Sequence, residues 1–291
     1  MVYLDHAATT PLDGRVLQAM TPYLTEIYGN ASSQHSYGRM AANAVTEARD
    51  KIADIMGVSP SELYFTSGGT EAGNTALKGV CAALRGRGRH VVLSALEHPA
   101  LISAANDMRE YGYEITLVNP AKNGIVSAES VAGAIHPDTV FVGVMAANNE
   151  VGTIQPIKDI YAACRERNVF LYCDCVQTAG VLPFGLFPAD GIGFSAHKFY
   201  GPKGFGGLYV RGNCRFERLI SGGEQERGLR GGTTYVAGAV GCALALEIAE
   251  REEKSNNENI RRRRGLYVKR VLAEIEGTHV KEKKKKRLPS N

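Results

Sequence analysis

Short, continuously apolar runs alternate along this chain with longer segments of helical character. Helices are expected from about residue 71 to 84, after Pro99, and from about residue 156. The apolar runs of strand length cover residues 63–66, 90–94, 114–118, 140–145, 169–172, 191–194 and 205–210. Strands that are apolar throughout and separated by helices are typical of a parallel sheet covered on both faces. The pattern predicts an α/β fold with a mostly parallel sheet of seven-stranded type, covered by helices.

The pattern changes near the end of the chain. Residues 237–251 form an Ala- and Leu-rich segment that predicts one helix, and the highly charged residues 256–275 predict a second. We expect the second helix to leave the large domain and to start a smaller one. The predicted division is an N-terminal segment, 1–14, that joins the small domain, a large domain over 15–250, and an incomplete small domain over 251–291.

Polar clusters follow five of the predicted strands. Ligands of parallel sheets bind at the carboxyl ends of the strands, so these clusters are expected to form one composite site. The clusters are Ser67-Gly68-Gly69-Thr70, Glu97-His98, Asn148-Asn149-Glu150, Asp174 with Gln177, and Ser195 to Lys198.

Lys198 and Asp174 carry the strongest chemical signal in these clusters. A lysine at a strand end can lose its proton by desolvation and form the Schiff base that anchors pyridoxal phosphate. The alternative is a surface lysine beside a turn. Asp174 follows an apolar strand, where an unpaired carboxylate is costly to bury. The protonated pyridine nitrogen of a cofactor would be a cationic partner that offsets the cost of burying this carboxylate.

The glycine-rich run before the first long helix predicts a phosphate cradle. Gly69 and its neighbours offer backbone N–H groups at the positive end of a helix dipole, and Thr70 adds a hydroxyl. The alternative is an ordinary turn with Thr70 as the N-cap. Ser195 and His197 can add phosphate hydrogen bonds beside Lys198.

Three further side chains are suited to a planar ring with polar substituents. His98 can stack on a pyridine ring, although a histidine near a helix start is the alternative. Gln177 can donate to the ring's phenolic oxygen. Asn149 is suited to bond a ring or substrate oxygen, with Asn148 either sharing that role or serving as a turn residue.

Charge and composition favour a globular protein and give no sign of a nucleic-acid-binding surface. The chain has 291 residues, 44% of them hydrophobic, which is enough for a substantial core. The net charge of +4 is carried by two basic runs, at 261–264 and 281–287, and the rest of the chain is mildly acidic. Such runs are typical of a solvated helix face and a loop, so no direct nucleic-acid partner is expected.

The cysteine spacing indicates whether a metal site is expected, and the hydropathy pattern indicates the cellular location of the protein. Six cysteines occur without a CxxC pair or a His-rich spacing, so no metal site is expected. Cys173 and Cys175 share a strand face opposite Asp174 and are expected to be buried thiols. The sequence has no signal-like start and no apolar run of about 18 residues, which predicts a soluble, cytoplasmic protein without a membrane partner.

The order of the motifs resembles that of the cysteine desulfurases, class V members of the pyridoxal phosphate aminotransferase fold. The resemblance covers roughly residues 1–250. The motifs are Asp5-His6-Ala7-Ala8-Thr9-Thr10, Tyr28-Gly29-Asn30-Ala31-Ser32-Ser33-Gln34-His35, Thr66-Ser67-Gly68-Gly69-Thr70-Glu71, Glu97-His98, Asn148-Asn149-Glu150-Val151-Gly152, Asp174-Cys175-Val176-Gln177, Ser195-Ala196-His197-Lys198 and Glu226-Arg227-Gly228-Leu229-Arg230-Gly231-Gly232-Thr233.

This resemblance implies catalytic roles for two residues, Lys198 and His98. Lys198 would form the Schiff base with pyridoxal 5'-phosphate and move the α-proton of the substrate, L-cysteine. His98 would stack on the ring and transfer protons. Asp174 would keep the pyridine nitrogen protonated, and Gln177 would bond the phenolic oxygen.

The resemblance also implies a phosphate site and partners. Thr70, Ser195 and His197 would bind the phosphate with the backbone of Gly69. Thr233 would reach the phosphate of a neighbouring subunit, which implies a homodimer with shared active sites. In this family a protein thiolate takes the substrate's sulfur, leaving alanine and a persulfide. An iron–sulfur scaffold or another sulfur-acceptor protein, serving cluster assembly or tRNA thiolation, is the implied partner.

One part of the family pattern has no counterpart in this sequence. The family's nucleophilic cysteine lies on a Ser-Ser-Gly-Ser-Ala-Cys-like loop, followed by an arginine for the substrate carboxylate. Residues 288–291 resemble the segment just before the small domain's sheet, so the chain is expected to be truncated there. We expect the chain to bind the cofactor, while complete sulfur transfer is in question because an absent thiolate cannot attack. The alternatives are a selenocysteine lyase, another class V enzyme, or a non-catalytic cofactor-binding homologue.

Overall fold

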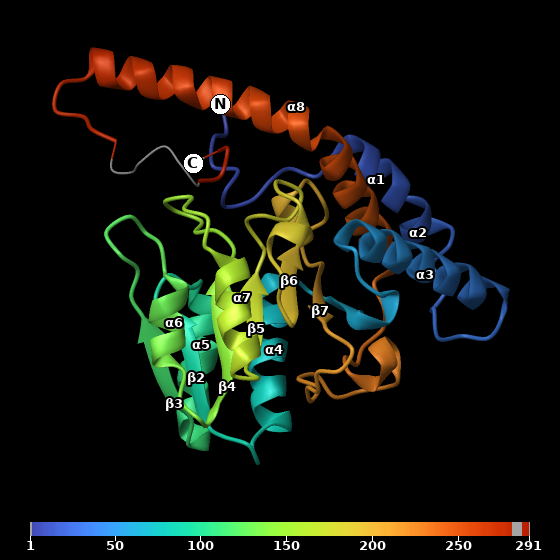
Figure 1. Ribbon diagram of the computed structural model, residues 1–291. Coiled ribbons are helices and arrows are strands. Elements are labelled where there is room, and N and C mark those ends of the chain that lie inside the picture. Colours follow the sequence, from blue (N-terminus) through green and yellow to red (C-terminus); the bar gives the residue numbers. More distant parts are fainter. Residues whose placement is uncertain (1, 281–286, 291) are drawn as a thin grey trace.

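The computed structural model describes residues 2–280 and 287–290 (Figure 1). The helices are α1 (Gly14–Met20), α2 (Pro22–Thr25), α3 (Ser36–Met56), α4 (Gly69–Ala83), α5 (Pro99–Met108), α6 (Ala128–Ala134), α7 (Ile157–Glu166) and α8 (Val236–Glu274). The strands are β1 (Leu63–Thr66), β2 (His90–Ser94), β3 (Glu114–Val118), β4 (Thr139–Met145), β5 (Phe170–Asp174), β6 (Gly191–Ser195) and β7 (Gly206–Val210). All seven predicted strands are therefore present.

The strands form one sheet in the order β1-β7-β6-β5-β4-β2-β3. Only β7 runs against its neighbours, β1 and β6. The reason is the connection from β6 to β7, residues 196–205, which holds a single 3-10 turn, Ala196–Lys198, and is too short for a crossover helix. The other strands are parallel, so the carboxyl ends of β1, β2, β4, β5 and β6 share one edge of the sheet.

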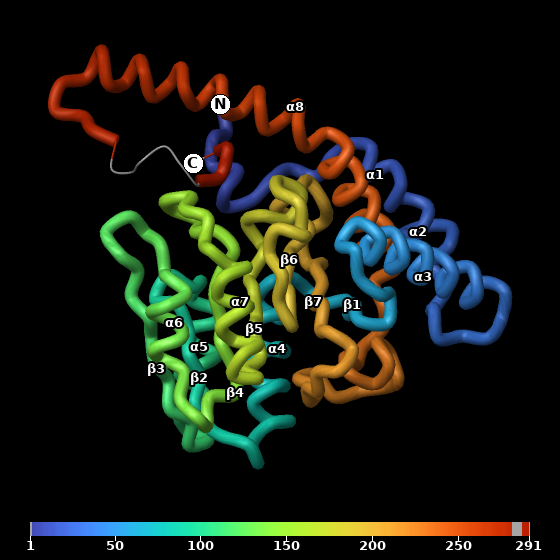
Figure 2. Tube along the Cα trace, viewed as in Figure 1, coloured from blue at the N-terminus to red at the C-terminus, as the bar shows by residue number. Residues whose placement is uncertain are grey.

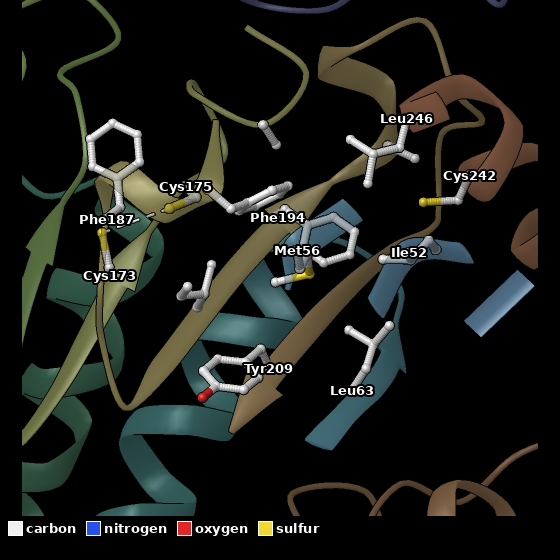
Figure 3. Close-up of a cluster of buried hydrophobic side chains, with 14 of the residues drawn as sticks. Ile52, Met56, Leu63, Cys173, Cys175, Phe187, Phe194, Tyr209, Cys242 and Leu246 are labelled. Carbon is white, nitrogen blue, oxygen red and sulfur yellow. Dashed lines mark hydrogen bonds between the residues drawn. The ribbon is translucent and has the colours of Figure 1, made fainter. Parts of the chain in front are cut away.

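Two apolar cores cover the two faces of the sheet. On one face, α4 and α5 pack Leu77 and Leu101 against the strand residues Phe141 and Tyr172. The other face is covered by α3, α7 and α8. Figure 3 shows part of this second core, where Ile52 and Met56 of α3 lie near Phe194 of β6 and Leu246 of α8. Strands buried on both faces explain why the sequence lacks the polar alternation of an exposed sheet.

The C-terminal helices expected at 237–251 and 256–275 form one continuous helix, α8, of 39 residues. No glycine or proline interrupts residues 251–258, and Asn257 is buried, donating through Nδ2 to the carbonyl of Val181 at 2.7 Å and to Glu253 at 3.2 Å. These bonds hold the junction in helical form, so the expected boundary at residue 250 lies within a helix. Figures 1 and 2 show the second half of α8 extending beyond α1 and α3.

The end of the described chain returns to the sheet edge. Arg287 forms an antiparallel bridge with Thr153, and the N–H of Leu288 donates to the carbonyl of Gly152 at 2.9 Å. Most of the basic run 281–287 lies outside the described residues. Within the described part of the chain, no helix has both the length and the apolar character that a membrane span requires.

Candidate active site

A cavity of about 920 Å³ opens at the edge where the parallel strands end. Its walls come from the segments that follow β1, β2, β4, β5 and β6, together with the N-terminal segment. The predicted site residues that line it are Gly69, Thr70, His98, Asn149, Asp174, Gln177, Ser195, His197 and Lys198. The remaining one, Thr233, is exposed and lies outside this cavity.

Lys198 ends the 3-10 turn after β6, and its amino group points to the N-terminal segment. Nζ donates to the carbonyl of Ala8 at 2.9 Å and also to that of Ala7. Burial lowers the pKa of Lys198 below its ordinary value, and the negative charges of Asp174 and Asp5 counteract part of this effect. Desolvation thus favours the neutral amine, which is the nucleophilic form.

Asp174 is the last residue of β5 and lies in the cavity wall. Its Oδ1 accepts the N–H of Val176 at 2.8 Å. Within the described residues, no lysine, arginine or histidine forms an ion pair with it at 4 Å or less. Burial raises the pKa of Asp174, against the opposing bond from Val176 and the charges of His98 and Lys198. The carboxylate is therefore short of a close cationic partner.

Cys173 and Cys175 lie on the other side of β5. Both are fully buried in the core that contains α3 and α8, and their sulfur atoms are 3.7 Å apart (Figure 3). This agrees with the predicted opposite faces of Asp174 and its two neighbours.

The glycine-rich turn before α4 packs closely against the end of β6 and the segment that follows β5. Gly68 has φ +144°, a conformation that side chains rarely adopt, and a Cβ there would meet Ser195 Oγ at 3.2 Å. A Cβ at Gly69 would meet Val176 Cγ2 at 2.5 Å. The N-cap is Gly68, not Thr70, and no side chain caps this helix terminus. Thr70 and Ser195 both line the cavity.

His98 lies at the start of a helix, as one of the two sequence alternatives suggested, and its position also leaves the stacking role open to a ligand. It is the N-cap of α5, where its Nδ1 accepts the N–H of Ala100 at 3.1 Å, and it also lines the cavity. The cap fixes the ring and leaves Nε2 as the nitrogen that can exchange a proton with a ligand.

The two neighbouring asparagines have different positions in the structure. Asn148 is buried and is the turn residue, because its Oδ1 accepts the N–H groups of Glu150 and Val151 at 3.0 and 2.9 Å. Asn149 is the one that lines the cavity.

The N-terminal segment also forms part of the site, although its side chains gave no reason to expect this. Ala7 accepts a bond from Gln177 Nε2 at 3.1 Å as well as the one from Lys198. Thr9 Oγ1 lies 3.0 Å from His197 Nδ1. Alanine carbonyls carry no side-chain signal, so only the family motif at residues 5–10 could have indicated this wall.

A second histidine-containing group lies elsewhere. His90, His136 and Asp138 bring one potential metal ligand each within 4.8 Å of one another. Both ring nitrogens of His90, however, lie within 2.9 Å of the hydroxyls of Thr139 and Thr116, and its ring stacks on His136 at 4.3 Å. His90 is thus engaged in bonds within the fold.

Glu97 is a buried carboxyl behind the cavity, 6% exposed. Its Oε1 accepts the N–H of Met145 at 2.7 Å, and Oε2 has no hydrogen-bond partner among the described residues. Burial, and then the negative charge of Asp174, raise the pKa of Glu97 to about 8, against weaker bonds from Met145 and Ser94. Glu97 is therefore protonated at neutral pH.

Glu97→Gln should change how stability depends on pH. Because the folded-state pKa lies near 8 and the unfolded value near 4.5, the carboxyl favours folding below pH 4.5, and this contribution is lost as pH rises toward 8. Glutamine keeps the acceptor for Met145 and stays neutral. We expect the variant's stability advantage to grow by about 3 kcal/mol between pH 5.5 and 8, measured by urea unfolding. The exposed Glu110→Gln should run parallel to the wild type; a parallel curve for Glu97→Gln would contradict the assignment.

Comparison with known protein families decides the family. Residues 2–291 match the family described as Aminotransferase class-V. The chain belongs to the class V aminotransferase family. This confirms the resemblance inferred from the ordered motifs.

Several curated relatives of this class V chain are cysteine desulfurases. The IscS of Dictyoglomus turgidum is 40% identical over 292 residues, which cover all of this chain and 74% of that protein. The IscS of Methanosarcina thermophila is 39% identical, over all of this chain and 72% of that protein. The mitochondrial cysteine desulfurase of Eremothecium gossypii is 41% identical over 94% of this chain and 56% of its own length.

Solved structures agree with the fold. A NifS-like protein superposes with a TM-score of 0.95 at 39% identity, over 99% of this chain and 80% of the other. A structure described as SspA in complex with cysteine gives 0.82 at 37% identity, over 85% and 72%. These likenesses confirm the predicted α/β fold of the pyridoxal phosphate transferases.

Proposed function

We propose that this class V chain binds pyridoxal 5'-phosphate and acts on L-cysteine in the manner of a cysteine desulfurase. The observation that carries the proposal is the placement of Lys198 and Asp174 on the walls of one cavity that also contains the glycine-rich turn. Its relatives named cysteine desulfurase and the cysteine-bound SspA support the substrate.

The residues in the cavity fit this cofactor. Asp174 is a carboxylate without an ion-pair partner among the described residues, and the pyridinium nitrogen would supply one. The turn at Gly68 and Gly69 leaves no room for side chains at the start of α4, where an anion is favoured. Lys198 has a lowered pKa, as a carbonyl-binding lysine requires.

The bound cofactor would serve as an electron sink for a negative charge that develops at the substrate's α-carbon. Lys198 Nζ would hold the cofactor and then move the proton at that carbon. Asp174 would keep a proton on the ring nitrogen, and His98, oriented by its cap, would exchange a proton through Nε2. Gln177 and Asn149 would orient the ring and the substrate, and Thr70, Ser195 and His197 would hold the phosphate.

The six cysteines do not provide a sulfur acceptor at this cavity. None of them lines it. Burial raises the pKa of Cys81 and of Cys164 to about 12, and burial also raises the pKa of Cys173 and Cys242. A thiolate is the attacking form, so we propose that a thiol other than these six takes the sulfur.

The assembly and setting are part of the same proposal. Thr233 lies on an exposed segment after the turn Gln225–Gly228, and we propose that it reaches the phosphate of a second copy in a cytoplasmic homodimer. An iron–sulfur scaffold or another sulfur-acceptor protein would be the partner that receives the sulfur. The second half of α8 and residues 287–290 would belong to the small domain.

Loading the purified chain with pyridoxal phosphate tests the function. We expect a visible absorbance band that changes when L-cysteine is added. Alanine and sulfide should form faster when a reducing dithiol is supplied, because it takes the sulfur and is oxidised to a disulfide as sulfide leaves. L-selenocysteine, run in parallel, distinguishes a selenocysteine lyase, for which alanine would form preferentially from that substrate. A chain that retains no cofactor after gel filtration would overturn the proposal.

A further inference from the structure

Glu71 is a buried carboxylate beside the glycine-rich turn. It lies in the first turn of α4, directly after Thr70, and is 9% exposed. Its Oε2 accepts the N–H of Ser67 at 2.8 Å, so the carboxylate orders the backbone that enters the turn. A negative charge here is unfavourable for a phosphate in the same turn, because like charges repel most strongly where water is excluded.

Arg230 neutralises this carboxylate with two bonds. Nε donates to Oε1 of Glu71 at 2.8 Å and Nη2 donates to Oε2 at 3.1 Å. Burial raises the pKa of Glu71, but the bonds from Arg230 and Ser67 outweigh it and hold the pKa below its ordinary value. The planar guanidinium matches the carboxylate geometry, which a lysine would not.

A second buried ion pair fixes the segment that carries Arg230. Arg49 of α3 donates to both oxygens of Glu226, at 2.7 and 2.9 Å, and Glu226 also accepts the N–H of Phe65 at 2.8 Å. Glu226 and Arg227 have positive φ values, 46° and 59°, which non-glycine residues rarely adopt. Such a conformation persists only where the surroundings over-determine it, so the position of Arg230 is set by α3 and β1.

We propose that Arg230 is a positioning residue for the phosphate subsite: it cancels the charge of Glu71, so that Glu71 can order the turn without repelling the cofactor's phosphate. This inference rests on the proposed function, since it takes the turn as the phosphate subsite. It assigns to Arg230 an effect on the phosphate and not on the ring.

The test compares two ligands that differ only in the phosphate, pyridoxal 5'-phosphate and pyridoxal. In Arg230→Ala, we expect affinity for pyridoxal phosphate to fall about tenfold or more, because an unpaired Glu71 is left beside the dianion. Affinity for pyridoxal should change less than about twofold. In the double variant Glu71→Gln with Arg230→Ala, the affinity for pyridoxal phosphate should return to within about threefold of Glu71→Gln alone, because the repelling charge is gone.

A matched control is available at the edge of the sheet opposite the cavity, where β7 ends and β6 begins. Arg211 bonds Asp190 at 2.7 Å, and the side chains of Arg211 and Arg230 are equally exposed, at 26%. Arg211→Ala removes a comparable ion pair and should leave the ratio of the two ligand affinities unchanged.

Three results would overturn the inference. Arg230→Ala could weaken both ligands equally, which would indicate a general structural role. The double variant could bind pyridoxal phosphate as weakly as Arg230→Ala does, or not bind it at all. Either result would exclude the charge of Glu71 as the cause of the lost affinity, and the double variant gives this answer even if Arg230→Ala alone does not fold. A wild-type chain that binds neither ligand would overturn the proposed function itself, and with it the inference.

Discussion

Replacing Lys198 by alanine should abolish covalent attachment of pyridoxal phosphate and, with an external thiol supplied as sulfur acceptor, reduce turnover of cysteine by about a thousandfold or more. Burial lowers the pKa of the Lys198 amine, and Lys198 lines the cavity together with all of the other predicted site residues except Thr233. Alanine removes both the group that binds the cofactor's aldehyde and the base for the α-proton. The measurement is the visible absorbance of the loaded protein and, after borohydride reduction, the mass of the labelled peptide.

Lys203 is the matched control for this experiment. It also lines the cavity, but it lies beyond the turn that follows β6. Lys203→Ala should keep the absorbance band, and the reduced wild type should carry its label on Lys198. A Lys198→Ala variant that keeps the band, or a label found on Lys203, would show that the attachment site was misassigned.

The positions of the strands could be predicted because burial on both faces leaves each strand apolar throughout. Val91, Phe141 and Leu171, for example, each have 5% or less of their surface exposed. The common edge followed from the parallel arrangement, so the polar residues after the strands could be grouped without knowing any contact. The reversed direction of β7 could have been predicted too, from the short connection that carries Lys198.

The helix α3 was not predicted, although its sequence has a helical period. Its buried positions include Ala41, Ala44, Ala48 and Ile52, and small alanines give a weak apolar signal. They matter because α3 packs against α8, where small residues allow the two helices to approach closely. Complementarity of two distant segments cannot be read from either one alone.

Other parts of the site depend on contacts that residue types do not encode. The bonds of Lys198 go to backbone carbonyls of Ala7 and Ala8, about 190 positions away in sequence. The raised pKa of Glu97 comes first from burial and then from the charge of Asp174, which lies at the end of β5 and far from Glu97 in the sequence. The role of Thr70 as a helix cap was equally open in the sequence, and only the backbone at Gly68 excludes it.

Asp174→Asn should separate activity from stability, with opposite signs. Asparagine carries no negative charge to hold a proton on the ring nitrogen, so turnover of the loaded protein should fall about a hundredfold or more. In the cofactor-free protein, burial raises the pKa of Asp174 above that of an unfolded aspartate. The carboxyl therefore loses its proton less readily in the folded state, and its charged form destabilises the fold as pH rises above the ordinary pKa of aspartate. The cofactor-free variant should therefore be more stable than the wild type at pH 8.

Asp190 provides the control that makes this result specific. Asp190 is 2% exposed and accepts bonds from Arg211 and from the N–H of Leu171. Asp190→Asn removes one member of a buried ion pair, so it should lower stability, whereas Asp174→Asn should raise it. Urea unfolding of the two cofactor-free variants at pH 8 measures the difference. If both substitutions destabilise the protein, Asp174 has a cationic partner within the fold, and the pyridinium nitrogen is no longer needed to account for its charge.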